Sequence, residues 1–395
     1  MRNANGRQFD MRLIGVALKN VLRRKSRSGL AAAGVASAVA AAIALVGFST
    51  GFETSAREVY LGHGVDLVVV RAGVTERLTS SLSASLAPEI AKLEHVQAVS
   101  ASLTDMVSFG ERSLVGIPVH GWSADSFVLG ALTIGEGRTL AAADHQGILL
   151  GAGLAKSLKK SVGDDLEMES SRFHIVGVFR GLNVYEDASA VVLLDDLQRL
   201  MDRSGQVTEF QVRLDRELPD RQATLEALCR QIEGLRDSSG QRFGLAAMPT
   251  QRYVSGSTEV HMAHGLAWAT TAIAMLIGCV GVLNTMSMSV FERTQEIGVL
   301  RAVGWHRWRI ILMIVCESQL IAAAGAAIGT ALIVPLAPLL ARIPLVQGLI
   351  RPEVAPAVVG LAVLLALLVG FIGSVYPSYR SSRLDVVRAL QCDAM

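Results

Sequence analysis

The chain has 395 residues, of which 51% are hydrophobic and 18% are charged. This composition is too apolar for an ordinary soluble protein, and the chain is long enough for a membrane part and a separate domain. Residues 51–263 hold 20 Lys and Arg against 28 Asp and Glu, whereas the remainder holds 17 against 7. No basic stripe interleaved with aromatic residues is present, so we do not expect nucleic acid as a partner.

Before the first apolar segment, residues 1–28 carry eight Lys and Arg. Met11, Ile14 and Leu18 recur there at helical spacing, which predicts an amphipathic helix lying in the cytosolic interface of a membrane. A plain helical extension of the first span is equally compatible with this pattern.

Four apolar segments approach or exceed the about 20 residues that a helix needs to cross the hydrocarbon core. They are residues 29–50, 264–290, 310–340 and 355–376. The third segment contains Pro335 and Pro338, which we expect to break the helix. A cleaved signal peptide is the alternative for the first segment, but its uncharged run exceeds the ~7–15 apolar residues of such peptides, which favours a membrane anchor.

Lys and Arg cluster at three places: eight lie in residues 1–28, four in 291–309 and three in 377–395. The positive-inside rule places these three segments in the cytosol. Residues 51–263 and the short loop 341–354 then lie outside. The sequence therefore predicts a multi-pass membrane protein with a large domain outside the cytosol.

The outer segment 51–263 alternates between strand-like and helix-like patterns, so we expect an α+β domain. The expected strands are residues 65–71, 96–109, 148–150, 173–178, 190–194 and 207–214, and the expected helices are 81–93, 196–201 and 223–235. Strand–helix–strand units at both ends flank a strand-rich centre. This order suggests two subdomains, one of residues 65–110 with 207–250 and one of residues 111–206.

The segment from Gly151 to Ser157 superficially resembles a phosphate-binding loop. Such a loop needs Gly directly before its Lys, where this chain has Ala155, so we expect a strand-to-helix turn and no ATPase activity in this chain. The eight histidines show no metal-site spacing, and no catalytic arrangement of residues can be proposed. We therefore expect neither a metal nor a cofactor in this chain.

Small residues punctuate the last three apolar segments, at Gly278, Gly281, Gly325, Gly329, Gly370 and Gly373. Such residues allow membrane helices to approach closely, either within this chain or against a second copy or homologue. Glu317 lies about one to two turns inside the third segment, where a carboxylate costs up to ~2.5–3.5 kcal/mol at mid-bilayer. Because the spans offer no second ionisable group, structural support of the adjacent cytosolic loop is favoured over a proton relay.

The loop 291–309 is short, charged and punctuated by Gly298 and Gly304, which predicts a short helix lying across the membrane plane. Ile297, Val299, Leu300 and Val303 offer an apolar surface, and Glu296 and Arg301 offer directional ion-pair contacts. On these grounds alone, anchoring of two helix ends at the interface and docking of a partner protein are equally supported.

The stretch from Glu292 to Gly304, ERTQEIGVLRAVG, resembles the signature E-R-x-x-E-I-G-x-x-R/K-A-L/V-G of the MacB/FtsX-like ABC permease family, which includes the LolC/LolE and DevC proteins. Glu317 matches an acidic residue that members carry early in the third span. The tail from Tyr376 to Leu390 is similar to the family's C-terminal pattern, with Val386 in place of the usual Pro.

This resemblance implies a non-catalytic permease of the inner (plasma) membrane with a large periplasmic domain. Such a permease acts by mechanotransmission on lipids, lipoproteins, peptides or drugs. The implied partners are two copies of a separate ABC ATPase that binds ATP and Mg, a second permease copy or homologue, membrane lipids, and a periplasmic adaptor with an outer-membrane channel. The implied ATPase-coupling residues are Glu292, Arg293, Glu296, Ile297, Gly298, Leu300, Arg301 and Gly304. A second cytosolic contact is implied at Tyr376, Pro377, Arg380, Arg383 and Asp385.

An FtsX-like regulator that activates a cell-wall hydrolase and transports nothing is the alternative function. The outer domain of about 210 residues favours the transporter, because the resemblance implies a much smaller domain for such regulators.

Overall fold

The structure is a computed structural model that describes residues 25–74, 77–109, 114–169, 171–218, 220–340 and 355–383. The expected amphipathic helix before residue 25, the outer loop 341–354 and Asp385 lie outside these residues. The chain divides into two compact units. The helical unit comprises Met1–Thr50, Ala263–Leu340 and Pro352–Met395, and the sheet unit comprises Gly51–Met262 and Ala341–Arg351.

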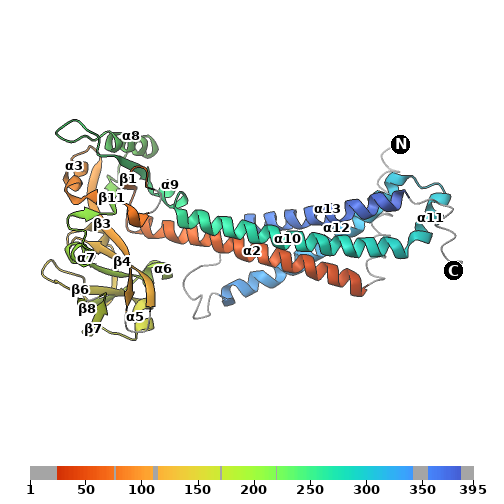
Figure 1. The fold of residues 1–395 in the computed structure, drawn as a ribbon, viewed down its shortest axis with the longest axis horizontal. Coiled ribbons are helices and arrows are strands. Elements are labelled where there is room, and N and C mark those ends of the chain that lie inside the picture. Colours follow the sequence, from red (N-terminus) through yellow and green to blue (C-terminus); the bar gives the residue numbers. More distant parts are fainter. Residues whose placement is uncertain are drawn as a thin grey trace. The chain divides into compact units, whose positions relative to one another are not determined.

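Within the described residues, four helices are long and apolar enough to cross a membrane (Figure 1). They are α2 (Lys25–Gly62), α10 (Thr258–Glu292), α12 (Arg307–Leu340) and α13 (Pro356–Ser382). Each contains one of the four predicted spans, and the α+β domain lies between the first and the second. α2 ends just before Gly64, whose φ of 76° is a conformation that glycine adopts without steric cost.

The expectation that Pro335 and Pro338 break the third span is wrong, because α12 continues through both to Leu340. Proline removes one backbone donor and crowds the preceding turn. Membrane helices tolerate this because neighbouring helices and side chains can satisfy the carbonyl groups that proline leaves free.

Glycines bring the backbones of the helical unit close together. A Cβ added to Gly329 would lie 2.5 Å from the backbone oxygen of Ala36 on α2, and one added to Gly325 would lie 2.7 Å from Cβ of Val35. A Cβ added to Gly370 of α13 would lie 2.7 Å from Cβ of Ala322, and one added to Gly373 would lie 3.0 Å from Cγ1 of Val282. A Cβ added to Gly278 would make ordinary contacts with Ala38 and Val369, and one added to Gly281 would meet no atom within 4 Å. Five of the six predicted packing glycines therefore lie against helices of this same chain, four of them too tightly for a larger side chain.

A ten-stranded sheet, mostly antiparallel, forms the centre of the sheet unit, in the order β12-β1-β11-β3-β4-β9-β6-β8-β5, with β7 pairing to β3 and β8. Its strands are β1 (Leu67–Arg71), β3 (Val96–Phe109), β4 (Leu114–Trp122), β5 (Thr133–Gly137), β6 (Gly147–Gly151), β7 (Asp165–Met168), β8 (Ser171–Arg180), β9 (Ala190–Leu193), β11 (Glu209–Leu214) and β12 (Leu245–Pro249). The two parallel pairs are β4 with β9 and β6 with β8. β2 (Leu82–Ser83) and β10 (Gln206–Val207) form a separate small ribbon.

Short helices connect these strands: α3 (Ala87–Ala91), α4 (Phe127–Gly130), α5 (Ala152–Leu158), α6 (Val184–Asp187), α7 (Leu194–Leu200), α8 (Arg221–Glu233) and α9 (Thr250–Ser255). The helix expected over residues 81–93 is wrong in its first half, where β2 and a 3-10 turn precede α3. A helix starting at Ser81 would place Pro88 in its interior, where it would remove a backbone hydrogen bond. As observed, Pro88 lies in the first turn of α3, a position that proline favours.

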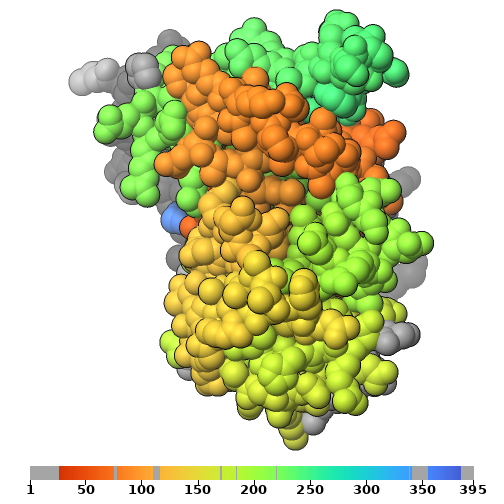
Figure 2. Space-filling view, turned by 90° about the vertical axis from the view of Figure 1, so that its left-hand side faces the viewer, coloured from red at the N-terminus to blue at the C-terminus, as the bar shows by residue number. Residues whose placement is uncertain are grey.

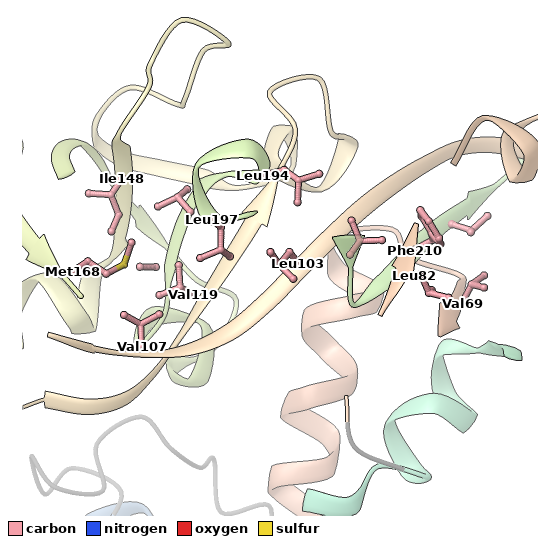
Figure 3. Close-up of a cluster of buried hydrophobic side chains, with 14 of the residues drawn as sticks. Val69, Leu82, Leu103, Val107, Val119, Ile148, Met168, Leu194, Leu197 and Phe210 are labelled. Carbon is pink, nitrogen blue, oxygen red and sulfur yellow. The ribbon is translucent and has the colours of Figure 1, made fainter. Parts of the chain in front are cut away.

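Apolar side chains cover both faces of the sheet. Leu67 and Val69 point into one core and Val68 and Val70 into the other, because successive strand residues face opposite sides. Figure 3 shows part of the first core, in which Phe210 lies near Val69. The second core is covered by the last turns of α2 together with α4 and α9.

The two predicted subdomains correspond to two stretches of this one sheet. In Figure 2 the orange residues of β1 to β3 lie toward the top with the green residues of α8, and the yellow residues of β6 to β8 lie toward the bottom. The β3–β4 pair joins the two stretches without a break in hydrogen bonding. The division into subdomains therefore stays a prediction.

Candidate functional site

The loop between α10 and α12 folds into a short helix, α11 (Thr294–Ala302), which Figure 1 labels. Thr294 lies at its start, and the hydroxyl of Thr294 donates to the carbonyl of Phe291 in the last turn of α10 at 2.8 Å. Its end is fixed by Gly304, whose φ of 100° favours glycine, and by the Trp305 amide, which donates to the Leu300 carbonyl. Two sharp changes of backbone direction therefore set α11 apart from the helices on either side.

A buried ion pair joins the start of α11 to α12. Nη1 of Arg293 lies 3.1 Å from Oε2 of Glu317, and both side chains are only 7% exposed. A buried charge is strongly unfavourable unless an opposite charge and hydrogen bonds compensate it. Ile297 packs beside this pair at 2% exposure. The contact thus fixes which side of α11 faces α12.

The other end of α11 is held by α13. Nη1 of Arg301 donates to the backbone oxygen of Ser382 at 2.6 Å. The last carbonyls of a helix have no partner within that helix, and cationic side chains commonly satisfy them. Two further contacts brace the junction: Arg27 pairs with Glu292, and the Arg380 guanidinium lies 5.1 Å from the Phe291 ring centre.

The opposite side of α11 is exposed. The side chain of Glu296 is 65% exposed, Val299 is 48% exposed and Val303 is 76% exposed. Residues three and four positions apart lie on one side of a helix, so these three side chains form one surface, which we call the α11 outer face. Exposed apolar residues grouped beside a charge are typical of a protein-binding surface.

The predicted coupling residues divide between the two sides of α11. Arg293, Ile297 and Gly298 are buried against the chain's own helices, whereas Glu292, Glu296 and Gly304 are exposed. Leu300 and Arg301 are half-buried. The structure thus separates residues that position the helix from residues that a partner could touch, and their roles in coupling stay predictions.

The predicted second contact divides in the same way. Tyr376, Arg380 and Arg383 are exposed, while Pro377 is buried inside α13. Sequence reasoning assigned Glu317 a supporting role but did not identify Arg293 as its partner, nor Ser382 as the partner of Arg301. The signal for the first was available: Glu317 is the one carboxylate within the third apolar segment.

The described residues hold no group of three or more His, Cys, Asp or Glu side chains that could bind a metal ion. The segment that resembles a phosphate loop forms the junction of β6 and α5, a strand-to-helix turn.

Comparison with known proteins gives two adjoining matches. Residues 28–232, more than half of the chain, match the MacB-like periplasmic core domain, and residues 268–386 match the FtsX-like permease C-terminal domain. The chain belongs to the MacB/FtsX-like ABC permease family. It is therefore a multi-pass membrane permease with an extracytoplasmic domain between its first and second membrane helices.

Individual relatives cover nearly the whole of this permease. It is 26% identical to the macrolide export ATP-binding/permease protein MacB of Bdellovibrio bacteriovorus, over 93% of this chain but only 59% of that protein. It is also 26% identical to the uncharacterized ABC transporter permease YvrN of Bacillus subtilis, over 96% of this chain and 98% of that protein. It is 22% identical to the uncharacterized ABC transporter permease MJ1507 of Methanocaldococcus jannaschii, over 96% of this chain and 97% of that protein.

Proposed function

We propose that this permease couples ATP hydrolysis by a separate ATPase subunit to movement of its extracytoplasmic domain. The observation that carries the proposal is the α11 outer face, which presents Glu296 and Val299 of a short helix together with Val303 directly after its last residue. A relative named as an ATP-binding/permease protein exceeds this chain in length, whereas relatives named only as permeases match it end to end. ATP and Mg would then bind to the partner and not to this chain.

The transmission path that we propose begins at the outer face of α11. A push on this face would reach α12 through the pair of Arg293 and Glu317, and α13 through the hydrogen bond of Arg301. Because both contacts are short and at least partly buried, α11 would move with these helices as one body. We propose two ATPase copies and a second permease copy, with a lipid, lipoprotein, peptide or drug as the substrate that is exported or extracted.

The test uses the full chain produced together with the ATPase encoded beside its gene. Glu296→Lys reverses a charge on the α11 outer face, and Val303→Asp puts a charge in its apolar part. Neither side chain is buried, and Glu296 contacts Arg293 only at the long distance of 4.0 Å, so the permease should fold normally. We expect both variants to lose co-purifying ATPase and to lower permease-stimulated ATP hydrolysis about tenfold or more. Glu296→Lys would bring like charges together at an interface, which costs several kcal/mol, and Val303→Asp would bury an unpaired charge there.

The matched control is Glu217→Lys, the same reversal at an exposed position of the extracytoplasmic domain. It should leave both measurements unchanged. If Glu296→Lys and Val303→Asp keep the complex and its stimulated hydrolysis, α11 is not the coupling element. Release of substrate from energised vesicles then separates a transporter from a regulator, which would stimulate a periplasmic hydrolase without moving anything.

A further inference from the structure

The sheet unit contains a cavity of about 210 Å³ between its second core and the last turns of α2. Aliphatic and aromatic side chains line it, the aromatic ones including Phe52, Tyr60, Trp122 and Tyr253. An apolar cavity of about 150 Å³ is enough to hold benzene. The space therefore fits one ring and a short polar chain.

Two buried side chains of the wall carry an atom with no hydrogen-bond partner. Gln211 is 3% exposed and His63 is 4% exposed, and the unpartnered atoms are Oε1 of Gln211 and Nδ1 of His63. Leaving such a group unsatisfied in the interior costs about 1–3 kcal/mol. Two residues of the wall thus each hold a buried polar atom without a hydrogen-bond partner.

The neighbouring hydrogen bonds show what kind of group would satisfy these two atoms. Nε2 of Gln211 donates to Oε1 of Glu209 at 2.7 Å, so the free atom of this amide is its acceptor oxygen. Nε2 of His63 lies 2.5 Å from Oε1 of Glu186 and donates to that carboxylate, and in the tautomer whose single proton is on Nε2 the atom Nδ1 is an acceptor. An occupant with several N–H or O–H donors would satisfy both acceptors by displacing the side chains that cover them.

The charge around the cavity favours a cation over a neutral donor. Glu186 and Glu259 line the cavity, and the buried Glu209 lies directly behind its wall, where it accepts a hydrogen bond from Tyr253 at 2.9 Å. Among the described residues, the histidines of the wall are His63 and His120, and no Lys or Arg lines it. Behind the wall, Glu209 is accompanied by Arg213, whose guanidinium donates to the backbone oxygen of His63 at 2.7 Å. The preference for a cation therefore rests on the lining carboxylates of Glu186 and Glu259.

Aromatic rings add a second attraction for a positive charge. Tyr60 and Tyr253 meet edge to face with ring centres 5.7 Å apart, and His120 stacks on Trp122 at 5.4 Å. Ring faces attract ammonium groups by about 0.5–2 kcal/mol, and more where water is excluded. We propose that this cavity is a binding site for a small amphipathic amine, with an aromatic or aliphatic body against the rings and an ammonium group toward Gln211 and His63.

The experiment titrates the full chain in lipid nanodiscs with three probes of similar size: phenethylamine, phenethyl alcohol and phenylacetate. Heats are measured by titration calorimetry, and heats from empty nanodiscs are subtracted. We expect saturable binding in which the amine binds about tenfold more tightly than the alcohol, with no binding of the carboxylate. Binding at this site needs no ATPase, so its outcome is independent of the coupling role of α11.

Two variants localise the site. Ala56→Trp fills the cavity from α2 and should abolish amine binding, whereas Ala142→Trp, at an exposed loop position, should leave it unchanged. Glu259→Gln removes an exposed carboxylate of the wall and should weaken amine binding about three- to tenfold while leaving alcohol binding unchanged. Glu217→Gln is its matched control.

The proposal is overturned if the amine shows no saturable heat above empty nanodiscs, which would mean that water alone occupies the cavity. It is equally overturned if phenylacetate binds as tightly as the amine, or if Ala56→Trp retains binding. If Ala56→Trp does not fold, Glu259→Gln still decides, because equal amine affinity in that variant and in the native chain contradicts the charge argument.

Discussion

The helical unit packs small residues of α2, such as Ala32 and Val35, directly against Gly325 of α12, whereas the sheet unit fills its interior with large side chains such as Phe109 and Phe210. The first arrangement depends on close approach of backbones, which gives membrane helices much of their association. The second depends on the amount of apolar surface removed from water. The helical unit should therefore be sensitive to enlargement and the sheet unit to truncation.

The two units also treat buried charge differently. In the helical unit, Arg293 and Glu317 neutralise each other, and their contact positions α11. In the sheet unit, Glu186 and Glu209 gather with His63 around a cavity. The charges of Arg293 and Glu317 compensate each other, whereas the cluster at the cavity contains polar atoms without a hydrogen-bond partner. This contrast explains why we assign the first to positioning and the second to ligand binding.

The largest loss of stability should come from removing one member of the buried ion pair of Arg293 and Glu317. Arg293→Met leaves the Glu317 carboxylate buried without its cation, which should cost about 3–5 kcal/mol of unfolding free energy. Glu317→Met should cost a similar amount, and the double variant should recover most of the loss, because no buried charge then remains. Unfolding of the purified chain in one detergent, followed by circular dichroism, measures all three.

Arg27→Met is the matched control for this cycle. Arg27 pairs with Glu292, but its side chain is 46% exposed, and exposed pairs contribute about 0–1 kcal/mol. A loss in Arg27→Met equal to that in Arg293→Met would refute the special status of the buried pair. The same conclusion would follow if the double variant lost as much unfolding free energy as Arg293→Met and Glu317→Met together.

The sequence predicts the larger features of both units for a simple reason: hydropathy, charge asymmetry and strand alternation are local signals. β3 covers the predicted residues, and α8 differs from its prediction by two residues at each end. β4 was missed because Gly116, Pro118 and Gly121 give it the composition of a turn. Pro118 is tolerated there because β9 pairs with β4 only from Val119 onward, so no strand on that side needs the missing amide.

The candidate site was predictable as a segment but not as a surface. The motif identifies α11, yet its rotation depends on a contact between Arg293 and Glu317, which are 24 positions apart. Only the packed helices show that Ile297 is buried and Val303 is exposed. A motif mixes residues that hold a helix in place with residues that face a partner, and spacing alone does not separate them.

An intermediate effect should follow from enlarging a confined glycine. In Gly329→Leu the new Cβ would lie 2.5 Å from the Ala36 oxygen, so α2 and α12 must separate, and overpacking of this kind costs about 1–3 kcal/mol. Gly281→Leu is the matched control, because no atom lies within 4 Å of its Cβ position, and its stability should change by less than about 0.5 kcal/mol. Unfolding midpoints in one detergent compare the two. Equal midpoints would show that close helix approach does not stabilise the helical unit.

The smallest effect concerns the sheet unit. Burial raises the pKa of the Cys229 thiol to about 11, with the neighbouring Glu233 adding to the shift. Only the thiolate is nucleophilic, so iodoacetamide should alkylate Cys229 slowly at pH 8.5 in the folded chain and rapidly in guanidinium chloride. The measurement needs Cys279, Cys316 and Cys392 replaced by Ala, and mass spectrometry of the product against time.

The sign of the pH effect follows from the direction of this shift. The folded state favours the protonated thiol, so its contribution to stability is complete below the unfolded pKa of about 8.5 and is lost as the pH rises toward about 11. Ala142→Cys, in a chain that also lacks Cys229, places the thiol at an exposed position for comparison. If Cys229 reacts as fast as this exposed thiol at pH 8.5, the core around α8 opens readily to solvent. The sheet unit would then not owe its order to the tight enclosure of large side chains, and its contrast with the helical unit would fail.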